Sequence, residues 1–111
     1  MNLKTEQQGN IQVVFVREER LDANNSESLK TEMLRLFESG THDMLIDLKE
    51  VRFIDSSGLG VLVSGFKNAA ARQGNLKLCS LQSQVKSMFE LTRLHRVFDI
   101  FPSVDEALDS Y

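Results

Sequence analysis

Two adjacent serines, Ser56 and Ser57, are the residues of this sequence whose position could best support chemistry. They belong to the segment FIDSSGLG, residues 53–60, which follows a short apolar run and opens a predicted helix. The N–H groups of a first helical turn have no partner inside the helix, and the helix dipole adds partial positive charge there. A phosphate on such a serine is electrostatically tolerable, so the pair forms a sensible phosphate acceptor.

A plain helix cap is an alternative explanation for the same residues. In the sequence Asp-Ser-Ser-Gly, one side chain can accept a hydrogen bond from an unpaired N–H and do nothing more. Spacing alone favours the cap, although both interpretations can hold together because a capping serine is also an exposed one. Gly58 and Gly60 lack side chains, so another protein could approach the backbone closely at this turn.

The sequence lacks the patterns of the common catalytic and phosphate-binding sites. A nucleophile elbow requires a glycine two residues before the serine, but Ile54 and Asp55 occupy those positions. No Gly-Lys-Ser or Gly-Lys-Thr motif is present, and Val63 replaces the third glycine of a dinucleotide-binding fingerprint. We therefore expect a protein that is not an enzyme and that uses no cofactor.

Residues that could bind a metal are few and scattered. His42, His95 and Cys79 do not follow a metal-ligand spacing, so no metal site is expected. We interpret the two histidines as surface or hydrogen-bonded residues and Cys79 as part of a packed strand. Asp47 and Asp55 could form an acidic pair, but we interpret Asp47 as a strand residue that faces a loop.

Length and composition indicate one globular domain. The chain has 111 residues, 41% apolar and 26% charged, with a net charge of −3, and can bury a core without metals or disulfides. Its basic residues are scattered, which argues against direct nucleic-acid binding. No stretch reaches the roughly 18 apolar residues of a membrane span, and residues 1–9 lack the apolar core of a signal peptide. Together with the single cysteine, these features predict a cytoplasmic protein with no membrane partner.

The hydrophobic periodicity predicts an α/β fold. Strands are expected at residues 3–8, 11–16, 44–48, 76–80 and 97–101, and helices from about 24 to 40, from 55 to 74, around 85–92 and at 104–108. Right-handed crossovers would make most strands parallel, while the initial hairpin adds an antiparallel edge. We expect a single domain with a mixed, mostly parallel sheet of about four to five strands, covered by about four helices.

The segment MLIDLKEVRFIDSSGLGVLVSGFKNAAARQGNLKLCSL, residues 44–81, resembles the central signature of the anti-sigma factor antagonists, which belong to the STAS domain family. The similarity extends back through RLDA at residues 20–23 and forward through Val85, Met88 and Phe89 to LTRL at residues 91–94. The DSSGLG core in register with a preceding apolar strand is the specific part of the pattern. The similarity predicts a STAS domain over residues 3–108 and a C-terminal tail at 109–111.

The resemblance implies that Ser56, the serine directly after the aspartate, accepts the phosphate. Asp55 would help to form the recognition turn, and Ser57 would serve in capping and local contacts. Asp22 would lie in a loop close to the acceptor. The predicted partner-binding residues are Asp22, Asp55, Ser57, Gly58, Leu59 and Gly60.

The resemblance also implies a set of partners. Members of this group bind a serine kinase that is itself an anti-sigma factor, or that sequesters a similar regulator. The unphosphorylated form binds the kinase and frees its client, phosphorylation breaks the complex, and a metal-dependent serine phosphatase restores it. A monomer is expected. The alternative is a constitutive scaffold or a transport accessory subunit, because STAS domains also occur in such proteins.

Two positions depart from the pattern of the family. Glu19 stands where a glycine usually precedes the Leu-Asp pair, and Arg93 stands where a glycine usually follows the third helix. Neither belongs to the acceptor turn, so the expectation for Ser56 is unaffected. Glu19 changes an edge that could face the partner, which leaves the identity of the partner open.

Overall fold

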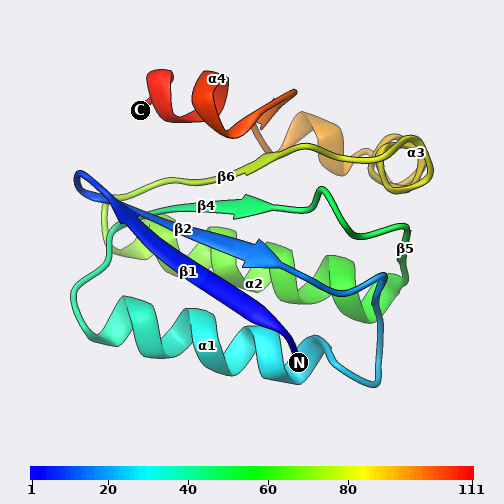
Figure 1. Ribbon diagram of the computed structural model, residues 1–111, viewed down its shortest axis with the longest axis horizontal. Helices are drawn as coiled ribbons and strands as arrows, with labels where there is room; N and C mark the ends of the chain where they lie inside the picture. Colours follow the sequence, from blue (N-terminus) through cyan, green and yellow to red (C-terminus); the bar gives the residue numbers. More distant parts are fainter.

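A computed structural model describes residues 1–111 as a five-stranded sheet with helices on both faces (Figure 1). The strands are β1 (Leu3–Gln8), β2 (Ile11–Val16), β3 (Arg20–Leu21), β4 (Asp43–Asp47), β5 (Phe53–Ile54), β6 (Leu76–Cys79) and β7 (Ile100–Phe101). The helices are α1 (Ser26–Glu38), α2 (Ser56–Ala71), α3 (Ser83–Leu91), the 3-10 helix η1 (Leu94–Arg96) and α4 (Val104–Asp109).

The order of strands in the sheet is β1-β2-β4-β6-β7. β1 pairs antiparallel with β2, and every other pair in this sheet is parallel. The predicted hairpin, the antiparallel edge and the mostly parallel α/β architecture are therefore confirmed.

Two features of the strands differ from the prediction. β3 and β5 form a separate two-stranded parallel ribbon, which was not expected because two residues carry no readable periodicity. The last strand is shorter than residues 97–101, since the chain first turns through η1 and then buries Phe98 before β7 begins.

The main hydrophobic core lies between the sheet and the helices α1, α2 and α3. Figure 1 shows α1 and α2 along one face of the sheet and α4 on the opposite face. The helical spacing of the apolar residues of α1 predicts one buried stripe, and all four of its members are buried: Leu29, Met33, Leu36 and Phe37. In α2 the spacing of the apolar residues predicts that the buried stripe ends at Ala70, but this is wrong, because Ala69 is buried and Ala70 is exposed.

The end of the chain packs against the second face of the sheet. The buried ammonium of Lys77 donates to the carbonyl and to the hydroxyl of Ser110, at 3.0 and 2.9 Å. The hydroxyl of Tyr111 donates to the carbonyl of Met44, and burial raises the pKa of this hydroxyl. Of the residues predicted as a tail, Asp109 thus closes α4 and Tyr111 contacts the sheet.

Candidate functional site

The candidate site lies where β5 ends and α2 begins. Ser56 is the first residue of α2 and is exposed, while Ser57 follows it and is half-buried. No hydrogen bond within the protein involves either serine hydroxyl. The structure therefore presents Ser56 with an unengaged hydroxyl, in the first helical turn that was predicted to tolerate a phosphate.

Asp55, and not a serine, caps the helix. Its Oδ1 accepts a hydrogen bond from the N–H of Gly58 at 3.0 Å, and its extended backbone is that of an N-cap residue. The expected helix cap is therefore confirmed, but the capping residue is Asp55 and not a serine. A carboxylate accepts this N–H more strongly than a hydroxyl does, and it leaves Ser56 free.

Asp55 also joins α2 to the loop between β3 and α1. Its Oδ2 accepts from the N–H of Ala23 at 3.2 Å, and its own N–H donates to the carbonyl of Leu21 at 3.2 Å. The loop itself is fixed by Asn25, whose Oδ1 accepts from the N–H of Asp22 at 2.9 Å. The structure thus brings the Asp22 loop beside the Ser56 turn, as the resemblance implied, although the two segments are 32 residues apart in the chain.

Position 58 at this junction has no room for a side chain, so only a glycine fits there. A methyl group in its place would come within 2.5 Å of the carbonyl oxygen of Leu21. Gly58 and Leu59 are both buried, the latter with 5% of its surface exposed. Their burial does not support the expectation that they contact a partner, and we assign them to packing. Gly60 is exposed, and a methyl group added to it would have nothing within 4 Å, so a partner could approach there.

Two residues beside the acceptor were not found from the sequence. The guanidinium of Arg20 lies 4.1 Å from the ring centroid of Phe53, and its Nε is 3.3 Å from Oδ2 of Asp22. The carbonyl of Glu19, at the position where a glycine was expected, accepts from the N–H of Phe53 at 3.2 Å. In β5, Phe53 is exposed and Ile54 is buried, an alternation that is typical of a strand and could have pointed to Phe53. Two residues are too few, however, to predict a strand from the sequence.

A shallow groove of about 320 Å³ runs between α1 and α2 next to the acceptor turn. Ser57 and Gly60 line it from α2, and Lys30 and Glu27 line it from α1. The predicted partner-binding residues Ser57 and Gly60 therefore share one concave surface, which is continuous with the exposed start of α2.

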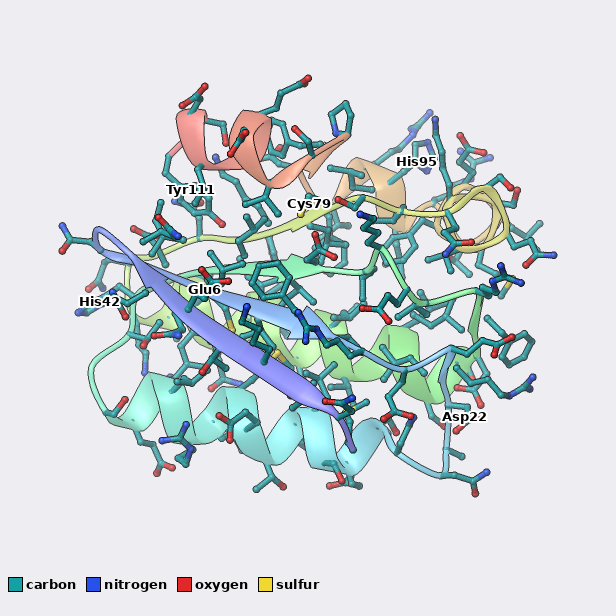
Figure 2. The ribbon with its side chains drawn as sticks, in the orientation of Figure 1. Glu6, Asp22, His42, Cys79, His95 and Tyr111 are labelled. Carbon is teal, nitrogen blue, oxygen red and sulfur yellow. The ribbon has the colours of Figure 1, made fainter.

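Neither histidine forms a hydrogen bond with a residue of this site. Figure 2 shows Asp22 and His42 at opposite ends of the molecule. Nδ1 of His42 is 2.8 Å from the carbonyl of Arg72, and Nδ1 of His95 is 3.3 Å from that of Phe89. No group of three potential ligands could hold a metal ion.

Cys79 and Asp47 form a buried polar contact at the ends of β6 and β4. Burial raises the pKa of the Cys79 thiol to about 12, which keeps it protonated and unreactive at neutral pH. The thiol donates to Oδ2 of Asp47 at 3.6 Å, and Oδ1 of Asp47 accepts from the N–H of Lys49 at 2.9 Å. Asp47 thus stabilises the loop after its strand and does not pair with Asp55.

Comparison with known proteins places these features in a family. The family model described as STAS domain matches residues 2–107. The anti-sigma-B factor antagonist of Bacillus subtilis (strain 168) is 36% identical over 80 residues, which is 72% of this chain and 72% of the relative.

Solved structures share the fold. An anti-sigma-factor antagonist (STAS) domain protein from Planctomyces limnophilus superposes with a TM-score of 0.89 at 24% identity, over 97% of this chain and 96% of that one. The phosphorylated form of the Bacillus cell fate determinant SpoIIAA gives a TM-score of 0.76 at 18% identity, over 98% of both chains. At these identities the likeness concerns the fold alone.

No helix of this chain combines the length and the apolar character that crossing a membrane would require.

Proposed function

Since the chain belongs to the STAS domain family, we propose that it is an anti-sigma factor antagonist, a binding protein and not an enzyme, which is switched off by phosphorylation of Ser56. The observation that carries the proposal is the exposed hydroxyl of Ser56 at the start of α2, which no group of the protein engages. Because Asp55 provides the cap, Ser56 can be modified without the loss of any hydrogen bond of the fold.

The partner is a serine kinase that acts as the anti-sigma factor. In the unphosphorylated state the exposed start of α2, the Asp22 loop and the groove beside Ser57 and Gly60 form the binding surface. Binding there releases the client of the kinase. A serine phosphatase returns the phosphorylated form to the cycle, and the protein acts as a cytoplasmic monomer.

Charge explains why a phosphate would separate the complex. A phosphoserine carries about −1.5 to −2 charges at neutral pH. At Ser56 this charge would adjoin the carboxylate of Asp55, which caps the helix and holds the Asp22 loop through Ala23. An unpaired charge buried in an interface costs on the order of 3–5 kcal/mol, which corresponds to about two to four decades in affinity. The helix N-terminus tolerates the phosphate in the free protein, so the fold changes little.

The proposal is tested first by mass spectrometry on protein purified from its own bacterium, followed by binding to the kinase that modifies it. We expect one added phosphate on Ser56, and a complex that Ser56→Glu weakens by at least about hundredfold. Ser56→Ala should retain binding but accept no phosphate, whereas Ser57→Ala should still accept one phosphate, on Ser56. Equal phosphorylation of the wild type and of Ser56→Ala would identify another acceptor. Complete absence of phosphate under all growth conditions would favour a constitutive scaffold.

A further inference from the structure

The β3–β5 ribbon has two distinct faces beside the acceptor serine. The register pairs Arg20 with Phe53 and Leu21 with Ile54. Side chains alternate along strands, so each pair shares one face of the ribbon. Leu21 and Ile54 are 0% and 2% exposed and belong to the core, whereas the pair of Arg20 and Phe53 faces outward.

Phe53 is an exposed aromatic side chain that is held in place. Its exposed fraction is 43%, and the Arg20 guanidinium lies 4.1 Å from its ring centroid. The guanidinium is itself fixed by the bond from Nε to Asp22. A ring that is already ordered loses little conformational entropy when a partner covers it. The Arg20–Phe53 pair is therefore preorganised for contact.

The pair is continuous with the phosphate acceptor. Phe53 precedes Ser56 by three residues, which in extended chain spans at most about 10 Å. The intervening Asp55 is fixed by its bonds to Gly58 and Ala23. A protein that binds over Ser56 with a footprint of ordinary size is therefore wide enough to reach the backbone of Phe53.

Leu91 provides a useful contrast, because it is more exposed than Phe53. Leu91 ends α3 with 78% of its surface exposed, and it has no aromatic ring on which a cation could stack. Single exposed apolar residues of this kind are common and need no functional explanation. Phe53 differs through its stacked arginine and its fixed strand register.

We propose that the Arg20–Phe53 pair is the anchor by which the kinase docks on this protein, an inference that rests on the function proposed above. Phe53 enters an apolar pocket of the kinase, and Arg20 pairs with a carboxylate at the rim of that pocket. Within the protein only Nε of Arg20 has an acidic partner, so the terminal nitrogens can still bind a carboxylate. Aromatic and arginine side chains commonly carry much of the affinity of an interface.

The test measures binding of the purified kinase that phosphorylates Ser56, with ADP present so that no phosphate is transferred. We expect Phe53→Ala to weaken binding at least about tenfold. Leu91→Ala, the matched loss of an exposed apolar side chain, should change it by less than about twofold. Arg20→Lys keeps the charge but loses the planar fork, and should weaken binding by about fivefold or more. In the phosphorylation assay, Phe53→Ala should raise KM and leave kcat unchanged.

The outcomes separate this inference from the function on which it rests. If Ser56→Glu fails to bind while Phe53→Ala binds as the wild type does, the anchor is overturned and the function stands. Equal losses for Phe53→Ala and Leu91→Ala would also overturn the anchor. If no kinase modifies Ser56, both proposals fall. Thermal unfolding of each of these variants, expected to match the wild type because Arg20, Phe53 and Leu91 are all exposed, excludes misfolding as the cause.

Discussion

The resemblance predicts a glycine at the turn that opens α2 and at the turn that follows α3, and the structure gives a different reason for each. Gly58 is retained, and its neighbour across the junction leaves no room for a side chain, with the Leu21 oxygen 2.5 Å from a methyl group placed there. Arg93 replaces the other glycine and adopts the left-handed conformation, with φ of 63° and an exposed side chain.

A glycine can be required because there is no room for a side chain or because the backbone is left-handed. The lack of room is the stricter of these two requirements. A backbone oxygen at a packed junction cannot move without moving the loop that carries it. A left-handed residue with a side chain costs about 1–2 kcal/mol, which a domain with several kcal/mol of stability can tolerate. The acceptor turn therefore keeps its glycine, and the turn after α3 does not.

The largest expected effect is that of Gly58→Ala. The new methyl group must displace the Leu21 carbonyl, which also accepts from the N–H of Asp55. Overpacking of this kind typically lowers the free energy of unfolding by about 1–3 kcal/mol, and we expect the upper part of that range. Urea unfolding of the purified variant measures the change.

Gly60→Ala is the matched control for this substitution. It lies in the same helix, is exposed and has open space around the added methyl group. Alanine is a better helix former than glycine by about 0.5–1 kcal/mol, so Gly60→Ala should be neutral or stabilising. If both variants were equally destabilised, the helix as a whole and not the contact with Leu21 would set the requirement for glycine.

Asp55→Ala should have an intermediate effect at the same turn. The substitution removes the cap on the Gly58 N–H and the bond to the Ala23 N–H. Loss of a cap costs about 0.5–2 kcal/mol, and we expect a decrease of about 1.5 kcal/mol in the free energy of unfolding. Asp55→Asn keeps one acceptor oxygen and should lose about half as much. Faster amide hydrogen exchange at Ala23 in both variants would show that the loop has been released, and unchanged exchange would contradict the proposed link.

The sequence was sufficient to predict the architecture where its patterns are long. The β-branched run of β2 and the four buried positions of α1 gave the correct elements and the correct buried face. The position of Ser56 at the start of a helix followed from the apolar residues on either side of it. These features depend on local periodicity, which a single sequence carries in full.

The details of the site depend on contacts between distant segments and could not be predicted. The choice of Asp55 as the cap was open because aspartate and serine are both good capping residues. The bond from Ala23 to Asp55 and the stacking of Arg20 on Phe53 arise from the pairing of two short strands that lie 33 positions apart. The burial of Leu59 follows from how α2 packs on this ribbon and not from the composition of the turn.

Arg93→Gly should have the smallest effect, and its sign should be opposite to that of Gly58→Ala. Glycine removes the cost of a left-handed residue, about 1–2 kcal/mol, but it also gains freedom in the unfolded chain, which offsets about 0.4–1 kcal/mol. We expect a net stabilisation of about 0.5–1 kcal/mol in urea unfolding. Arg93→Ala keeps the left-handed conformation and should show no gain in the free energy of unfolding. Both variants lose the exposed guanidinium, so the difference between them measures the cost of the left-handed backbone alone. Equal stability of the glycine and alanine variants would mean that the left-handed residue carries no strain, and the distinction between the two turns would then be one of space alone.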